Sequence, residues 1–388
     1  MPIAPAQRLQ ALPPYLFAEI DRRKRAAIAA GKDVIDLGVG DPDRPTHEFV
    51  IRRMQEAVAV PSNHRYAPGW GLAEFNRQAA EWMRCRFGVD LDPHRQVLTL
   101  IGSKEGLGHL PLATINPGEV ALVPQPGYPV YQSATIFAGG QVQVMPLRAE
   151  SRWLPVLEEI PADAARRARL MFINYPNNPT AATCDADFFR KVVDFAAEHD
   201  LLVAHDAAYT EVYFDQRPPS ILQINGAVDR CVEFHSLSKT FNMTGWRLGF
   251  AAGNATALAA LAKVKNNVDS GQFLAVQWAG VQALAQHDHV AVKAQLDVYR
   301  ERRDVFVHGL RKLGYRVEMP RATFYVWAPC PAGMSSLEFA SRVLEEANVV
   351  LVPGIGFGQA GEGYFRAALT IPVERLQEAV DRLAGIRF

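Results

Sequence analysis

The sequence predicts an α/β protein with a mostly parallel central sheet in a large domain and a smaller α/β domain beside it. A chain of 388 residues with 49% hydrophobic content can bury a large core and divide into a big domain and a smaller one. Short apolar runs that end in polar or turn residues recur through the middle of the chain, as buried strands of a parallel sheet do. Helical patterns separate several of these runs, which indicates the α/β class.

Six apolar runs are the predicted strands of the large sheet. They lie near residues 97, 120, 170, 201, 231 and 247 and read VLTLIGS, VALVPQPG, LMFINYPNNP, LLVAHDAAY, CVEFHS and RLGFAAGN. The clearest helix between them is DADFFRKVVDFAAEHD, whose apolar residues between Phe188 and Ala196 share one face. Ligands of open α/β sheets bind outside the carboxyl ends of the strands. In this chain those ends carry Ser103, Asn178, Asp206 and Ser236.

The last quarter of the chain predicts a second, smaller sheet. A helix that begins near residue 290 has apolar residues spaced by threes and fours from Val292 to Leu310, interrupted by Arg303, and is long enough to bridge two domains. The segments TFYVWAPC, VVLVPG and YFRAALTI predict strands. A final helix has one apolar stripe, made of Val373, Leu376, Val380 and Leu383.

Composition and charge exclude several classes of partner. Lys plus Arg and Asp plus Glu both number 41, so no net field attracts nucleic acid or an anionic membrane, and we expect a small-molecule partner. The four cysteines show no C-x-x-C spacing, which argues against a zinc site or a secreted disulfide framework. We expect no metal and a cytoplasmic location. The N-terminus lacks a signal-peptide layout, and no apolar run is long enough to span a membrane.

Two short motifs match enzymes of other classes, but their contexts are wrong. Ser236 to Lys239 fits the S-x-x-K of penicillin-binding enzymes, yet the companion S-D-N and K-T-G motifs are absent. Gly356 to Gly361 fits the dinucleotide fingerprint G-x-G-x-x-G, which must open a helix. Here a predicted strand follows, so we interpret this segment as a glycine-rich loop.

Asp206 and Lys239 form the central pair of candidate residues, because each comes just after an apolar strand. A carboxylate buried there needs a cationic partner. An amine in a low-dielectric pocket has a lowered pKa and attacks carbonyl groups. Pyridoxal phosphate would unite the two residues: Lys239 would hold its aldehyde as a Schiff base, and Asp206 would keep its pyridine nitrogen protonated.

The other groups that this cofactor needs are also present. Asn178 and Tyr209 could donate hydrogen bonds to its phenolic oxygen. The N–H groups at a helix start after LIGSKEG, with Ser236 and Arg247, would bind its phosphate. Each residue alone has an ordinary interpretation as a cap, a turn or a surface residue, so the combination carries the prediction.

The motifs NYPNNPT, HDAAY, HSLSKTFNMTGWRLGF and YFRAALT resemble those of the class I/II aminotransferases, which are fold-type I pyridoxal phosphate enzymes, and the resemblance spans nearly the whole chain. It implies a ping-pong transfer of an amino group from an amino acid to a 2-oxo acid by a homodimer with shared active sites. It also implies a division into an N-terminal segment that joins the small domain (1–45), a large cofactor-binding domain (46–285) and a small C-terminal domain (286–388).

The resemblance assigns roles to individual residues. It implies that Lys239 is the Schiff-base lysine and proton shuttle, that Asp206 faces the pyridine nitrogen, and that Tyr209 and Asn178 face the phenolic oxygen. The residues implied around the rest of the cofactor are Tyr128 on the ring, Ser103, Lys104, Ser236 and Arg247 at the phosphate, and Tyr66 reaching the phosphate from the neighbouring subunit. Those implied at the substrate are Arg366 and Gly40 at the α-carboxylate, Asn178, and Tyr15.

Among the subfamilies, the segments LPPYLFAEID, IGSKEGLGHLPLA and NPGE most resemble LL-diaminopimelate aminotransferases, which use 2-oxoglutarate as amino acceptor in lysine biosynthesis. The stretch NNVDSGQFLAVQW lacks the arginine by which aspartate-type enzymes bind a distal carboxylate. Trp70 would suit an apolar or aromatic donor. Alanine, aromatic or aspartate-type activity and a carbon–sulfur lyase therefore stay open as alternatives. One departure from the family is Ala181 in place of the glycine of N-P-T-G, which is strained if the backbone there needs a positive φ.

Overall fold

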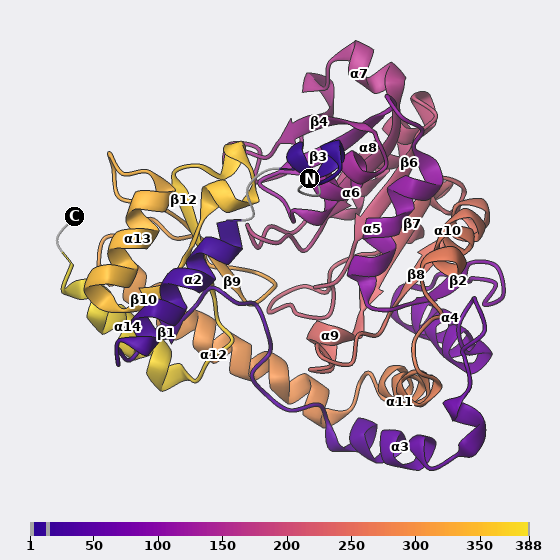
Figure 1. Cartoon of the computed structure of the whole chain (residues 1–388), viewed down its shortest axis with the longest axis horizontal. Helices are drawn as coiled ribbons and strands as arrows, with labels where there is room; N and C mark the ends of the chain where they lie inside the picture. The colour runs from indigo at the N-terminus through magenta and orange to yellow at the C-terminus, as the bar shows by residue number, and fades with distance from the viewer. Residues whose placement is uncertain (1–3, 13–15, 387–388) are drawn as a thin grey trace.

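Within the residues that the computed structural model describes, 4–12 and 16–386, a seven-stranded sheet forms the centre of the larger half of the molecule (Figure 1). Strand β8 is antiparallel to both of its neighbours, and the other pairs are parallel. The strand order is β2 (Val97–Leu100), β8 (Gly249–Gly253), β7 (Cys231–Ser236), β6 (Leu202–Asp206), β5 (Ala168–Asn174), β3 (Val120–Gln125) and β4 (Gln141–Pro146).

The mostly parallel sheet and all six of its predicted strands are confirmed. Strand β4 was missed, because the run QVQVMP at the sheet edge is largely half-buried and carries glutamines at alternate positions. An edge strand faces solvent along one side, so it lacks the continuous apolar run by which the central strands were recognised.

Helices cover both faces of the sheet (Figure 1). Strand residues alternate between two core clusters: Leu122 packs into one and Val123 into the other. The helices on the Val123 side are α5 (Ser103–Thr114), α6 (Val130–Phe137) and α10 (Ala255–Val268). Those on the Leu122 side are α4 (Ala73–Phe87), α8 (Ala186–Glu198) and α11 (Leu274–Ala285). The shorter helices of this half are α1 (Gln7–Gln10), α3 (Glu48–Val58), α7 (Ala162–Arg167) and α9 (Leu237–Thr240).

Helix α8 is the predicted amphipathic helix. Asp185 caps its N-terminus by accepting a 2.9 Å hydrogen bond from the backbone N–H of Phe188. The predicted apolar face from Phe188 to Ala196 is buried against the sheet. Local pattern and tertiary packing therefore agree at this element.

The smaller half of the molecule combines the two ends of the chain (Figure 1). Strand β1 pairs in parallel with β10, and a separate three-stranded antiparallel sheet has the order β11, β12, β9 within the described residues. This pairing supports an N-terminal segment that joins the C-terminal domain, while the domain limits at 45 and 285 stay predictions. The elements are α2 (Leu16–Ala29), β1 (Ile35–Asp36), α12 (Val290–Lys312), β9 (Tyr325–Pro329), α13 (Ser336–Ala347), β10 (Val349–Val350), β11 (Val352–Pro353), β12 (Tyr364–Ala368) and α14 (Val373–Ala384).

Helix α12 runs from beside α11 into the smaller half (Figure 1). Arg303, which interrupts its apolar pattern, is nevertheless buried: it donates to the Pro320 carbonyl at 3.0 Å and lies 4.4 Å from the Phe214 ring centre. Its neighbour Arg302 makes two 2.7 Å hydrogen bonds to Asp43 of the N-terminal segment. Of the helices in the described ranges, none is long and apolar enough to cross a membrane.

The contact between α12 and α14 gives a stability prediction. A Cβ atom on Gly309 would lie 2.7 Å from both Cγ atoms of Val380, whereas one on Gly108 of α5 would meet Val130 at an ordinary 3.9 Å. We expect Gly309→Ala to lower the free energy of unfolding by about 1–2 kcal/mol, because overpacking outweighs the gain in helix propensity. The matched control Gly108→Ala should raise it by about 1 kcal/mol. Calorimetric unfolding of the two apoproteins checks this, and a Gly309→Ala protein with a raised Tm would contradict it.

Candidate active site

The candidate site lies where the sequence predicted it, at the carboxyl ends of the parallel strands. Asp206 is the last residue of β6, and Ser236 is the last residue of β7 and the cap of α9, which carries Lys239. Asn178 follows β5 and Ser103 opens α5 after β2. The fold therefore gathers at one edge of the sheet residues that lie far apart in the sequence.

Asp206 is a buried carboxylate held by neutral donors. Its Oδ2 accepts a 2.7 Å hydrogen bond from the Tyr131 hydroxyl, and its Oδ1 accepts one from the Ala208 N–H at 3.2 Å. Burial raises its pKa, against the opposite effect of these two bonds. Among the described residues no Lys or Arg forms an ion pair with it. Tyr131 was not predicted, although its place three residues after Tyr128 puts the two rings in contact.

Lys239 is half-buried, and its ammonium donates a 2.7 Å hydrogen bond to the Gly40 carbonyl. Burial, opposed by Asp41 and assisted by Arg247 and Arg366, lowers its pKa to about 8. The predicted role of Gly40 at the substrate carboxylate stays a prediction; in this structure its carbonyl accepts the hydrogen bond from Lys239. The arrangement yields an amine that is partly neutral near physiological pH.

Arg366 on β12 is buried among neutral acceptors. It donates to Asn178 Oδ1 at 2.8 Å and to the Gly38 carbonyl at 2.6 Å, and its guanidinium lies 4.2 Å from the Tyr325 ring centre. Its Nε is buried without a hydrogen-bond partner. A buried guanidinium with an unpaired N–H and no carboxylate in contact is suited to a carboxylate ligand.

Tyr209 shares a 2.8 Å hydrogen bond with the hydroxyl of Tyr325, which the sequence reasoning did not single out. Burial, together with Tyr325, raises the pKa of Tyr209, so its hydroxyl keeps its proton and can donate. A Cβ atom on Gly40 would lie 1.9 Å from the Tyr325 oxygen, which explains the glycine there. Two phenols therefore lie close to Gly40, whose carbonyl binds the lysine.

The predicted phosphate residues meet at the start of α5. The Arg247 guanidinium lies against Gly102, where an added Cβ would approach its Nη2 to 2.4 Å. Gly249 lies against the Ser103 N–H, 2.9 Å from an added Cβ. Lys104 is exposed, with its Nζ 5.8 Å from the Tyr128 ring centre. A helix N-terminus next to a guanidinium and lined by glycines forms a binding site for an anion.

The predicted roles of two further residues are not tested by this structure. Tyr66 is 86% exposed on the surface of the single chain. Tyr15 lies outside the described residues. Their predicted roles at the phosphate and at the substrate stay predictions.

Ala181 does adopt the left-handed conformation that the family motif gives to glycine, with φ 59°. Its N–H still binds the Asn177 carbonyl at 2.9 Å, so the turn is preserved. The left-handed backbone costs an alanine about 1–2 kcal/mol. Burial of its methyl group offsets about 0.8 kcal/mol of this cost. The departure is therefore tolerated at small cost.

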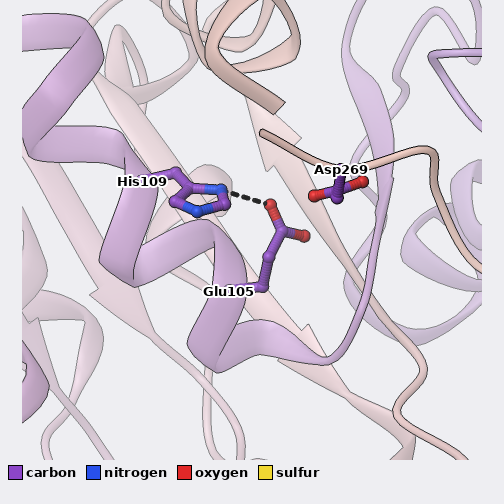
Figure 2. A group of neighbouring side chains, drawn as sticks. All are labelled: Glu105, His109 and Asp269. Carbon is purple, nitrogen blue, oxygen red and sulfur yellow. Dashed lines mark hydrogen bonds and ion pairs between the residues drawn. The ribbon is translucent and has the colours of Figure 1, made fainter. Parts of the chain in front are cut away.

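A cluster of Glu105, His109 and Asp269 lies beside α5 (Figure 2). His109 binds Glu105 at 2.8 Å, but the buried ammonium of Lys265 lies 3.4 Å from Glu105 and 2.7 Å from Asp269. The Lys265 ammonium thus neutralises the two carboxylates without a metal ion. We interpret the cluster as a set of polar contacts that holds the first turn of α5 against the end of α10.

Comparisons with known proteins agree with this geometry. The family described as "Aminotransferase class I and II" matches residues 32–383. An LL-diaminopimelate aminotransferase of Syntrophobacter fumaroxidans is 57% identical over all of both chains, and one of Desulforudis audaxviator is 53% identical over 99% of this chain and 98% of its own. The solved substrate-bound BacF of Bacillus subtilis superposes with TM-score 0.94 at 37% identity, covering 99% of this chain and 98% of that one.

The lowered pKa of Lys239 predicts selective labelling of the apoprotein. With a pKa of about 8, roughly half of its amine is neutral at pH 8, whereas a free lysine side chain is almost fully charged there. We expect acetic anhydride, followed by mass spectrometry, to label Lys239 with a midpoint near pH 8. Asp41→Asn should move the midpoint lower, because the Asp41 carboxylate favours the ammonium. A midpoint near that of a free lysine would show that burial does not act on this amine.

Proposed function

Since the chain belongs to the class I and II aminotransferases, which are pyridoxal phosphate enzymes, we propose that it transfers the amino group of LL-diaminopimelate to a 2-oxo acid, with 2-oxoglutarate as the acceptor. The observation that carries this proposal is the identity of 51–57% over essentially the whole chain to several relatives of that name. We also propose the residue roles that follow.

The described residues fit pyridoxal phosphate. Asp206 is a buried carboxylate with no Lys or Arg of the described residues paired to it, which suits a protonated pyridine nitrogen. The start of α5, with Arg247 against Gly102, suits a phosphate. When bound, this cofactor supplies an aldehyde that combines with amines and a ring that accepts electrons.

Lys239 performs the nucleophilic and proton-transfer steps. Because its pKa is lowered to about 8, its Nζ is available as a neutral amine that can combine with the cofactor aldehyde. With the cofactor bound, the same Nζ would act as the base that takes the proton from the α-carbon of the donor and would hold it for return to the reacting molecule. The Gly40 carbonyl, 2.7 Å away, holds the amine in place.

Arg366 binds the α-carboxylate of the donor. Its bonds to Asn178 and Gly38 orient the guanidinium without neutralising it, and the Tyr325 ring supports it from one face. Tyr209, linked to Tyr325, is placed to donate to the phenolic oxygen of the cofactor. Gly38 and Gly40 belong to the N-terminal segment, so closure of that segment would exclude water from both Arg366 and Lys239.

The side chain of Trp70 bears on the identity of the donor. Sequence reasoning placed it near an apolar or aromatic substrate, but the indole packs against the core cluster of its own chain, beneath α5 and α10. Its backbone carbonyl accepts hydrogen bonds from Thr99 N and Asn76 Nδ2. The indole is only half-buried there, so an apolar or aromatic donor stays an alternative to diaminopimelate.

We further propose a homodimer in which Tyr66 of one subunit reaches the phosphate of the other. The loop that carries Tyr66 is built on the end of α10: an added Cβ on Gly69 would lie 2.5 Å from Asn266, and one on Gly271 would lie 3.4 Å from Ala67. A firmly supported loop with a tyrosine 86% exposed at its tip suits contact with a second copy. A cytoplasmic location also stays a proposal, supported by the spacing of the cysteines.

A donor panel tests the substrate. With 2-oxoglutarate as acceptor, we expect LL-diaminopimelate to be turned over with higher kcat/KM than alanine, phenylalanine or aspartate. Glutamate formation separates transfer from lyase chemistry, which would release ammonia without an acceptor. Fast alanine or phenylalanine turnover without any activity on LL-diaminopimelate would refute the assignment but leave the aminotransferase class intact.

Arg366→Ala should lower kcat/KM about 100-fold or more for every donor, because a buried charge partner of the carboxylate is lost. Arg366→Lys should recover part of this activity, since the charge returns without the bidentate geometry. Arg190→Ala on the exposed face of α8 is the matched control, and its activity should not change. Normal kcat/KM in Arg366→Ala would show that another group binds the α-carboxylate.

Subunit complementation tests the shared site. Lys239→Ala should be inactive and Tyr66→Ala impaired at limiting cofactor. If Tyr66 acts across the dimer, a hybrid dimer of the two variants contains one intact site, so an equal mixture that exchanges subunits should recover about a quarter of wild-type activity. A mixture no more active than the mean of its parents would place Tyr66 outside the partner's site.

A further inference from the structure

A buried polar network lies on the face of the sheet opposite Asp206, and neither the sequence reasoning nor the proposed mechanism uses it. His205 directly precedes Asp206 on β6, so its side chain points to the other face. It pairs in register with Glu233 of β7, and both side chains are fully buried. His235, two residues further along β7, lies on the same face.

Glu233 is the acceptor at the centre of this network. It accepts hydrogen bonds from the Ser220 hydroxyl at 2.9 Å, the Ile221 N–H at 3.0 Å, His205 Nδ1 at 2.9 Å and His235 Nε2 at 2.7 Å. Burial alone would raise its pKa, but these donors outweigh burial and hold the pKa of Glu233 below its usual range. Glu233 is therefore ionised.

His205 faces an acceptor at each ring nitrogen. Its Nδ1 faces Glu233, and its Nε2 lies 3.0 Å from the Tyr175 carbonyl oxygen. A carbonyl has no hydrogen to give and an ionised carboxylate has none either, so both ring nitrogens must carry a proton. His235 needs to donate only from Nε2, which its neutral tautomer can do.

Four other titratable groups around the network are uncharged at neutral pH. Burial raises the pKa of Tyr175 after β5, Cys184 before α8, Cys231 on β7 and Tyr131 on α6. The ring of Phe189 on α8 closes over His205, and that of Trp82 on α4 over His235. Arg86 and Glu211 also lie near His235, where they pair with each other at 2.8 Å and Arg86 lies over the Phe87 ring that contacts His235.

We propose that His205, held as an imidazolium by Glu233 and the Tyr175 carbonyl, is a positioning residue that keeps the Asp206 carboxylate ionised from the opposite face of the sheet. The inference rests on the proposed role of Asp206 at the pyridine nitrogen. Burial raises the pKa of Asp206, and electrostatic attraction to His205 and His235 on the opposite face opposes this rise. Low dielectric surroundings leave this attraction little screened.

The charge on His205 is tested first, in the wild-type apoprotein. NMR of nitrogen-labelled histidine should show both ring nitrogens of His205 protonated at pH 8, with the signals assigned by their loss in His205→Gln. Glu233→Gln should return His205 to a neutral ring. An unprotonated ring nitrogen of His205 in the wild type would mean that His205 is neutral, and would overturn the proposal.

The effect on Asp206 is tested by infrared titration of the same apoprotein. The band of the protonated carboxyl, assigned by Asp206→Asn, should appear at higher pH in His205→Gln than in the wild type. If His205→Gln fails to fold, Glu233→Gln takes its place. Arg190→Ala, on the exposed face of α8 next to the Phe189 ring that packs on His205, is the matched control and should leave the titration unchanged. An unshifted Asp206 in a folded variant without the imidazolium would overturn the proposal.

Cofactor affinity provides the last readout. His205→Gln should bind pyridoxal phosphate about tenfold more weakly, the size of a one-unit change in the pKa of a contacting group. It should bind the 1-deaza analogue, which has carbon in place of the ring nitrogen, as tightly as the wild type does. Equal losses for both ligands would indicate a merely structural role and count against the proposal. Absence of pyridoxal phosphate binding by the wild type would instead refute the proposed function, and the titrations of His205 and Asp206 would still stand.

Discussion

The burial of Asp206 at the end of β6 is the constraint around which the site is organised. A carboxylate removed from water is stable only if hydrogen-bond donors or cations replace its lost hydration. Here the Tyr131 hydroxyl and the Ala208 N–H supply part of that stabilisation. In the roles proposed above, the remainder would come from His205 on the opposite face of the sheet and from the protonated ring nitrogen of the bound cofactor. The strand that carries Asp206 therefore links the core of the large domain to the chemistry.

The N-terminal segment is the second structural requirement. Its carbonyl groups at Gly38 and Gly40 accept hydrogen bonds from Arg366 and Lys239, two residues from opposite halves of the molecule. The same segment is tied to α12 by the two bonds between Asp43 and Arg302. The segment also pairs with β10 of the smaller half. A movement of the smaller half would therefore shift the hydrogen bonds of both the Lys239 amine and the Arg366 guanidinium.

Much of the fold could be read from local pattern. Central strands such as β5 and β6 are continuous apolar runs, and α8 has both a cap and an apolar face, so sequence and packing indicate the same structure. Edge strand β4 and the antiparallel direction of β8 could not be read, because edge exposure and strand direction depend on neighbours that are distant in sequence. Tyr131 and Tyr325 were missed for the same reason: each contacts its partner across a long sequence separation.

The sequence by itself determined which chemical groups are available: one lysine and one aspartate after apolar strands, an arginine in a late strand, and glycines where a phosphate would approach. Only the tertiary structure decided which groups touch. It assigned the Gly40 carbonyl to Lys239 and the Gly38 carbonyl to Arg366, and it placed the His205 ring, bonded to Glu233, on the face of the sheet opposite Asp206. The physical reason is that hydrogen bonds and charges act over a few ångströms in space, whereas the chain brings these partners together from positions far apart in sequence.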